Sequence, residues 1–251
     1  MNTSYKLLLA LMLLVTFVTC SYADTLKIAV ASNFIKPMQR ISSQFEREHG
    51  IAVISSFASS GKLYAQISHG APYDLFLSAD QDKPVALIEK GLALQESRFT
   101  YATGVLMLYR NNSDIPLLFP EILQSEKLKR IALANPKLAP YGRAAQEVLN
   151  EFGLLERDGI TLVMGENIGQ TYQFAFSGNV DIGLVALSQV IALDSQDQSL
   201  PIPTNLYSPI KQDAVMLNAS KQPQASRLFL QYLKTEQVRD IITEFGYRQT
   251  P

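Results

Sequence analysis

Residues 51–70 read IAVISSFASSGKLYAQISHG, in which an apolar segment leads into small polar residues and then into a helical pattern. We expect a strand at 51–57 and a helix at 61–70. Between them stand serines and one glycine, and Lys62 is the single charged residue of 55–67. Hydroxyl groups and bare backbone at the start of a helix suit an anion, because a helix N-terminus presents unpaired N–H groups.

The same strand-to-helix order recurs on both sides of this segment. Further strands are predicted at 25–32, 73–80, 101–110, 129–136, 160–167, 180–188 and 210–220, and further helices at 34–48, 83–91, 142–153, 169–179 and 223–246. The alternation runs over 25–91 and again over 129–188, which predicts parallel sheets covered by helices. We therefore predict an α/β protein of two lobes, with the strands near 101–110 and 210–217 crossing between them.

The first residues have the pattern of a secretory signal peptide. Lys6 precedes the uncharged run 7–18, and small residues precede a cleavage site after Ala23. The run is shorter than the roughly 20 residues of a membrane-spanning helix, and the residues before Cys20 fit a lipoprotein site poorly. We expect residues 1–23 to be removed and the mature protein to be periplasmic.

Composition and motifs argue against several classes of function. Removal of the signal peptide leaves no cysteine, and the 22 basic and 23 acidic residues of the whole chain nearly balance, so nucleic acid is not an expected partner. The two histidines, His49 and His69, have no metal-binding spacing. G-x-S-x-G, P-loop and dinucleotide-binding motifs are missing from the sequence. We predict no catalytic residue, no cofactor and no directly coordinated metal.

Four strand-to-helix junctions are rich in small residues, hydroxyls and amides: 31–34, 58–62, 134–143 and 165–170. Ligands of open α/β sheets bind beyond the carboxyl ends of strands, where such helices begin. Two junctions fall in each lobe, so hydrogen-bond donors would face one another across a cleft. A fully ionised tetrahedral dianion offers only acceptors and suits such a site. The alternative is that each Ser or Asn only caps its own helix.

Residues 55–81, SSFASSGKLYAQISHGAPYDLFLSADQ, resemble the periplasmic molybdate-binding proteins of bacterial ABC-type molybdate importers. The shared pattern is Ser-Phe-x-Ser-Ser, a helix, and Gly-Ala-Pro-x-Asp-Leu-Phe-x-Ser-Ala-Asp. The resemblance implies a type II, "Venus flytrap" periplasmic-binding-protein fold with hinged crossover strands, which closes on molybdate or tungstate and delivers it to a membrane permease. With this fold we expect lobe I at 24–101 plus 207–251 and lobe II at 102–206.

The resemblance also implies which residues contact the oxyanion: Ser32, Asn33 and Ser60 from lobe I, and Tyr141 and Ile168 from lobe II. Asn33 stands where many family members have serine, and we expect it to donate through its side-chain amide and its backbone. Ser60 would donate its hydroxyl and its N–H. Ile168 could contribute only its backbone N–H. Molybdenum would thus be held as an oxyanion, through its oxygens.

One position departs from the common family pattern. Many members carry a tyrosine ligand after the Gly-x-Val strand, where this chain has Ala186. Tyr141 instead stands at the APYG junction, where those members have a small residue. We hypothesise that the phenol of Tyr141 supplies the donor missing at Ala186. The alternative is that Tyr141 only packs against the helix predicted at 142–153.

Other functions stay open at this point. The same fold could bind another tetrahedral oxyanion, such as sulfate or phosphate. An exported serine hydrolase would need a histidine beside the cleft, and His69 is expected at the far end of its helix. A ligand-sensing domain of a regulator shares the architecture, but the signal peptide and the missing DNA-binding helices argue against it. We expect a monomer whose partner is the membrane permease of an ABC importer.

Overall fold

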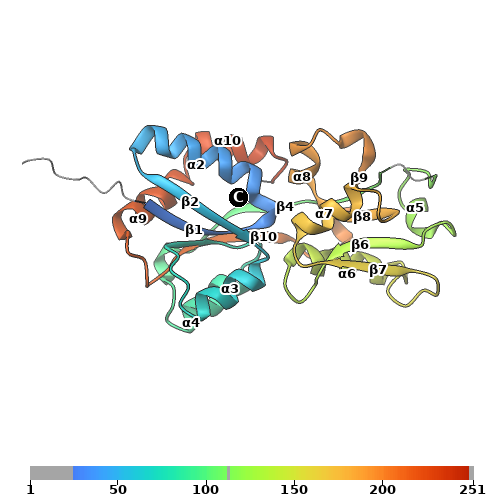
Figure 1. The fold of residues 1–251 in the computed structure, drawn as a ribbon, viewed down its shortest axis with the longest axis horizontal. Coiled ribbons are helices and arrows are strands. Elements are labelled where there is room, and N and C mark those ends of the chain that lie inside the picture. The colour runs from blue at the N-terminus through green and yellow to red at the C-terminus, as the bar shows by residue number, and fades with distance from the viewer. Residues whose placement is uncertain (1–24, 112–113, 249–251) are drawn as a thin grey trace, which may run out of the picture.

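The computed structural model describes residues 25–111 and 114–248, which form two five-stranded sheets (Figure 1). The first has the order β2-β1-β3-β10-β4, with β1 (Thr25–Ala31), β2 (Ala52–Ala58), β3 (Leu75–Leu77), β4 (Phe99–Gly104) and β10 (Ile210–Met216). The second has the order β7-β6-β8-β5-β9, with β5 (Leu106–Tyr109), β6 (Arg130–Ala134), β7 (Thr161–Gly165), β8 (Ile182–Ala186) and β9 (Ser199–Pro201). The predicted signal peptide lies outside the described residues.

Both sheets combine a parallel core with antiparallel crossing strands. β1 pairs in parallel with β2 and β3, and β10 lies antiparallel between β3 and β4. In the second sheet β6 pairs in parallel with β7 and β8, whereas β5 is antiparallel to β8 and β9. The chain crosses from β4 to β5 through Val105 alone and returns from β9 to β10. The predicted two-lobed α/β fold is confirmed.

Helices cover both faces of each sheet, as Figure 1 shows. The first sheet is flanked by α2 (Ile35–His49), α9 (Pro223–Tyr232) and α10 (Glu236–Glu244) on one side, and by α3 (Ser60–Ser68) and α4 (Asp82–Glu89) on the other. The second lobe has α5 (Glu121–Gln124), α6 (Pro140–Glu151), α7 (Ile168–Phe176) and α8 (Leu187–Ala192). Short 3₁₀ turns are η1 (Ser32–Phe34), η2 (Gln95–Ser97), η3 (Gln196–Gln198) and η4 (Thr204–Leu206).

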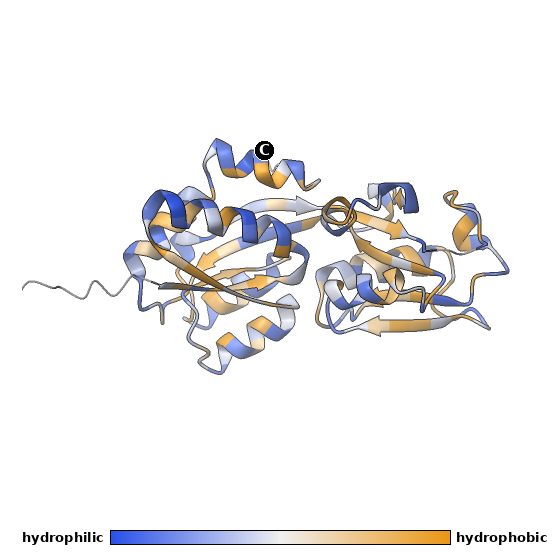
Figure 2. Ribbon diagram, turned by 45° about the horizontal axis from the view of Figure 1, so that its top comes forward, coloured by the Kyte–Doolittle hydropathy of each residue, from blue (hydrophilic) through white to orange (hydrophobic). Residues whose placement is uncertain are grey.

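The helices pack because each has one apolar face. α2 buries Met38, Ile41 and Phe45, which are spaced by three and four residues, and it ends at Gly50 with φ of 69°. Figure 2 shows the same division, with apolar strands inside and polar helix surfaces outside. No helix among the described residues has the length and apolar character needed to cross a membrane.

Two predicted elements differ from the structure. The strand predicted at 101–110 is divided at Val105 into β4 and β5, because there the chain passes from one sheet to the other. The helix predicted at 223–246 is two helices, since Thr235 is extended (φ −68°, ψ 154°) and is the N-cap residue of α10. The predicted lobe boundary at 101/102 falls within β4, whose Gly104 still pairs with Ile210. The lobe boundaries stay a prediction.

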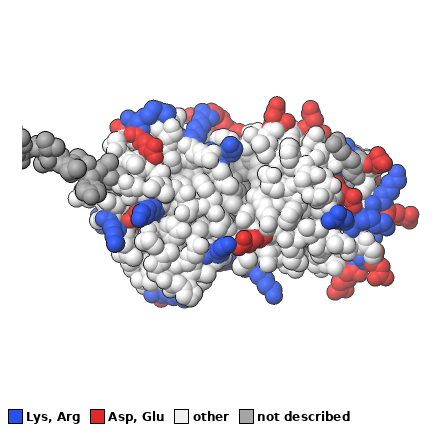
Figure 3. All heavy atoms as spheres, in the orientation of Figure 1, with Lys and Arg blue, Asp and Glu red and all other residues white. Residues whose placement is uncertain are grey.

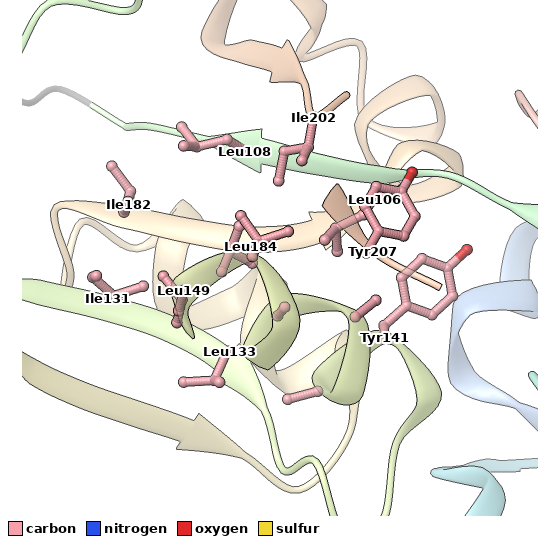
Figure 4. Close-up of a cluster of buried hydrophobic side chains, with 14 of the residues drawn as sticks. Leu106, Leu108, Ile131, Leu133, Tyr141, Leu149, Ile182, Leu184, Ile202 and Tyr207 are labelled. Atoms are coloured by element: carbon pink, nitrogen blue, oxygen red, sulfur yellow. The ribbon is translucent and has the colours of Figure 1, made fainter. Parts of the chain in front are cut away.

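Each lobe has its own apolar core. In the first lobe, Leu26, Ile28 and Val30 of β1 lie in one cluster with residues of α2, α9 and α10. In the second, residues of β5, β6 and β8 pack against α6 (Figure 4). Tyr141 lies at the edge of this second cluster, near Leu106 and Tyr207 in Figure 4. The position of the Tyr141 ring therefore depends on the core of its own lobe.

We expect Phe34→Ala to lower the free energy of unfolding by about 3–5 kcal/mol, because it leaves a cavity in the core. Phe34 is fully buried, and its ring centroid lies 5.0 Å from that of Tyr101 and 5.4 Å from that of Tyr247. Urea unfolding followed by circular dichroism measures the change. The control Leu118→Ala alters a side chain that is 55% exposed, and it should change stability by about 0.5 kcal/mol at most. Equal effects of both variants would contradict the packing described.

Candidate functional site

A small cavity, with a volume of about 10 Å³, lies between the lobes, where strands of both sheets lead into helices. Its lining is made of Ala31, Ser32, Asn33, Ser59, Ser60, Ala79, Ala139, Pro140, Tyr141 and Ile168. The structure thus brings together all five residues predicted to contact the ligand, one or more from each of the four junctions. No charged side chain of the described residues belongs to this lining.

The serines of the 58–62 junction enter the cavity wall at the start of α3. The hydroxyl oxygen of Ser60 accepts a hydrogen bond from the backbone N–H of Ala79 at 2.9 Å. That bond occupies a lone pair and leaves the Ser60 hydroxyl hydrogen free to be donated. Ser60 is 1% exposed, so an acceptor for this hydrogen must come from within the cavity.

Ser59 is a lining residue that the sequence analysis did not single out. It is the N-cap residue of α3, yet its side chain caps no backbone group. Its hydroxyl is buried and has no hydrogen-bond partner within the described parts of the chain. The signal in the sequence was the pair of adjacent serines at one junction, of which the resemblance pointed only to Ser60.

Asn33 lies in η1, directly after β1, but its side chain is engaged away from the cavity. The amide nitrogen donates to Oε1 of Gln212 at 2.8 Å and to the hydroxyl of Tyr247 at 2.9 Å. Both amide hydrogens therefore have protein acceptors, which a buried amide requires. The expected donation from the Asn33 side chain is wrong for this arrangement, and its backbone N–H is left as a donor. Ser32, beside it in η1, is also buried.

The second lobe presents two helix starts to the cavity. Pro140 occupies the first turn of α6, immediately before Tyr141. α7 begins at Ile168, and its N-cap Asn167 accepts a hydrogen bond from the N–H of Gln170. That cap serves the third residue of the helix, so the N–H of Ile168 stays available at the cavity wall. Positive ends of helix dipoles thus face the cavity, and they favour an anion.

The phenol of Tyr141 extends to the strands that connect the lobes. A Cβ atom placed on Gly104 would lie 2.2 Å from the Tyr141 hydroxyl, so this contact requires glycine. The pKa of Tyr141 is raised well above its ordinary value. Burial is the main cause, and the nearby Tyr247 is the second. The phenol is consequently a neutral O–H donor at physiological pH. Ala186, at the end of β8, is outside the cavity lining among the described residues.

The lobes touch each other around the cavity. The N–H of Gly61 donates to the carbonyl of Leu138 at 2.8 Å, and a Cβ on Gly61 would lie 3.0 Å from Leu138. The hydroxyl of Ser188 in α8 donates to the carbonyl of Asn33 at 2.9 Å. These direct contacts between lobes show that the structure is in a closed arrangement.

Ion pairs join the lobes farther out. Lys62 lies 2.5 Å from Glu166, and Arg143 of α6 lies 2.9 Å from Asp80 and 2.8 Å from Asp82. On the face shown in Figure 3 charged side chains lie mainly around the rim, and much of the surface over both lobes is uncharged. Within the described residues, no three His, Cys, Asp or Glu side chains are grouped as metal ligands. The charged side chains of the described residues therefore lie outside the cavity lining.

Several known proteins are similar to this chain in sequence and in structure. A family model described as "bacterial extracellular solute-binding protein" matches residues 26–248. The chain is 41% identical over 231 residues to the molybdate-binding protein ModA of Azotobacter vinelandii, covering 90% of each chain. It is 41% identical over 219 residues to that of Rhodobacter capsulatus, covering 87% of this chain and 86% of the relative.

The solved structure of the Azotobacter vinelandii periplasmic molybdate-binding protein matches with a TM-score of 0.85 at 35% identity. It covers 90% of this chain and 100% of that one. The resemblance predicted from residues 55–81 is confirmed by these matches.

We expect Arg143→Gln to weaken binding of molybdate, the ligand implied by the resemblance, by about fivefold at most. The reason is that the ion pairs of Arg143 with Asp80 and Asp82 join the two lobes and so favour closure. Partly exposed ion pairs contribute about 0.2–1 kcal/mol. Titration calorimetry at low and high salt measures it, and the loss should shrink at high salt. Arg40→Gln is the matched control, because Arg40 pairs with Glu244 within one lobe. An equal loss in both variants would contradict a role in closure.

Proposed function

Because the chain belongs to the family of bacterial extracellular solute-binding proteins, we propose that it captures molybdate, and also tungstate, in the periplasm. It hands the oxyanion to the membrane permease of an ABC-type importer. The names of its relatives support molybdate as the ligand. The observation that carries the proposal is the closed cavity between the lobes, lined by hydroxyl and N–H donors without a charged side chain.

The chemistry of the lining matches a tetrahedral dianion. An oxyanion without protons offers only acceptors, so it can occupy a site made of donors. The backbone N–H groups of Ser60, Tyr141 and Ile168, together with the hydroxyl of Ser60, would surround its oxygens. Hydrogen bonds to a charged group in a site closed to water are stronger than those between neutral groups. A carboxylate in the lining would oppose the ligand, and the lining contains none.

Capture proceeds by closure of the two lobes. Lobe I holds the oxyanion at Ser32, Asn33 and Ser60, and lobe II adds Tyr141 and Ile168 only when the lobes meet. The ligand therefore binds the closed state with more contacts than the open state and shifts the population toward it. The permease would recognise this closed form, in which the contact of Gly61 with Leu138 has formed.

The alternatives are less well supported by the geometry. Sulfate has the same charge and shape as molybdate but shorter bonds, so the size of the cavity would have to reject it. A serine hydrolase needs a histidine beside its serine. His69 lies just beyond the far end of α3, is exposed and has its Nδ1 2.7 Å from the carbonyl oxygen of Ala65. Neither histidine belongs to the cavity lining in the described residues.

Titration calorimetry of the mature protein tests the substrate. We expect saturable one-to-one binding of molybdate and of tungstate, and no heat with sulfate or phosphate at the same concentrations. Heat with sulfate alone would keep an oxyanion site and overturn the proposed substrate. The absence of heat with all four anions would overturn the assignment of the cavity as an oxyanion site.

The Tyr141→Phe substitution tests the proposed replacement of the family tyrosine. Loss of a hydrogen bond to a charged ligand should cost about 1 kcal/mol or more, which calorimetry detects as weaker molybdate binding. Because burial keeps the phenol protonated, the loss should be the same from pH 6 to pH 8. Tyr109→Phe is the control, since the Tyr109 hydroxyl donates to Gln198 at 2.6 Å. Unchanged affinity in Tyr141→Phe would mean that Tyr141 only packs.

A further inference from the structure

Gln212 lies in β10, one of the strands that connect the lobes, and its side chain is 0% exposed. The pairing of β10 with β4 shifts in register between Gln212 and Asp213. Such a bulge redirects a side chain from the regular alternation of the strand. A buried polar side chain at an irregular position of a connecting strand requires partners that justify its burial.

The carbonyl end of the Gln212 side chain has two donors. Oε1 accepts a hydrogen bond from the amide nitrogen of Asn33 at 2.8 Å and from the hydroxyl of Tyr101 at 3.1 Å. These two donors fix the orientation of the amide group, because its nitrogen could accept neither of the two bonds. The nitrogen must therefore occupy the opposite end, toward the second lobe.

The nitrogen of Gln212 and the hydroxyl of Tyr141 both lie close to Gly104. The position of a Cβ atom on Gly104 would be 2.8 Å from Nε2 of Gln212 and 2.2 Å from the Tyr141 hydroxyl, so both groups meet over this glycine. Nε2 is buried and has no hydrogen-bond partner among the described residues, so a bond to the nearby Tyr141 oxygen would give it one. Burial raises the pKa of Tyr141, and the contact with Gln212 acts in the opposite direction, as expected of a donor beside the phenol oxygen.

We propose that Gln212 is a positioning residue that turns the hydroxyl hydrogen of Tyr141 into the cavity. A phenol oxygen that accepts from the Gln212 amide cannot direct its own hydrogen at that amide, and the remaining direction is toward the ligand. Asn33 and Tyr101 hold the amide in the orientation that makes this possible. The inference rests on the proposed function and deepens it. It makes the orientation of the Tyr141 hydroxyl depend on Gln212, a residue of a connecting strand outside the cavity lining.

Two variants separate this role from a general effect on the fold. Gln212→Met keeps the length of the side chain and removes both the donor and the acceptor. Gln212→Glu keeps an acceptor for Asn33 and Tyr101, and it has a donor for Tyr141 only while its carboxyl group is protonated. Gln198→Met is the matched control, because Gln198 also bonds a tyrosine hydroxyl, that of Tyr109. Thermal unfolding shows whether each variant is folded at the temperature of the binding measurement.

The first readout is a double-mutant cycle of molybdate affinity, measured by calorimetry. We expect Gln212→Met to weaken binding at least tenfold in the wild-type background and less than threefold in Tyr141→Phe. Gln198→Met should leave the affinity unchanged. An equal loss in both backgrounds, or no loss in the wild-type background, would overturn the proposed action through Tyr141.

The second readout is the pH profile of Gln212→Glu, expressed as its dissociation constant divided by that of the wild type. We expect this ratio to rise at least tenfold from pH 5.5 to pH 8, because ionisation removes the donor and places a negative charge beside an anion. A flat ratio would overturn the inference even if the methionine variant did not fold. If the wild type binds molybdate and the Gln212 variants bind it with unchanged affinity, the inference is overturned but the proposed function is not. Wild-type protein that binds neither molybdate nor tungstate overturns the proposed function together with it.

Discussion

The backbone N–H groups of Ser60, Tyr141 and Ile168, at the starts of α3, α6 and α7, are the constraint on which the rest of this structure depends. They are directed at one cavity that closes between the lobes, and buried N–H groups without acceptors are costly. In the proposed function, a bound oxyanion would supply acceptors to these three groups together. This explains why the lining has hydroxyls and small side chains rather than charges, and why closure of the lobes and occupation of the cavity belong together.

The contacts between the lobes divide into an inner and an outer kind. The inner contacts are neutral hydrogen bonds close to the cavity, such as that from the N–H of Gly61 to the carbonyl of Leu138. The outer contacts are ion pairs of partly exposed side chains, such as Lys62 with Glu166. Exposed pairs contribute little on their own. Under the proposed function, a bound anion would add to these weak contacts and favour the closed state.

The region where the strands cross contributes more than a flexible connection. Buried polar groups of β4, β10 and the C-terminal residues meet Asn33 of the cavity wall: Tyr101, Gln212 and Tyr247. Tyr247 also donates to Asn33 and lies beside Ser188 of the other lobe. Because buried hydrogen-bonded groups have few alternative arrangements, this network gives the site a defined geometry when the lobes are closed.

The sequence by itself determined the two α/β lobes and brought five lining residues to attention. Strand and helix patterns are local, and the Ser-Phe-x-Ser-Ser stretch with its family resemblance pointed to Ser60 and to its counterparts at the other junctions. Only the tertiary structure decided that the Asn33 amide turns away from the cavity and that Gln212 lies against Tyr141. Asn33 is 179 residues from Gln212 and 214 from Tyr247 in the chain. A buried amide bonds to whichever groups the packing brings to it, and no local pattern encodes that choice.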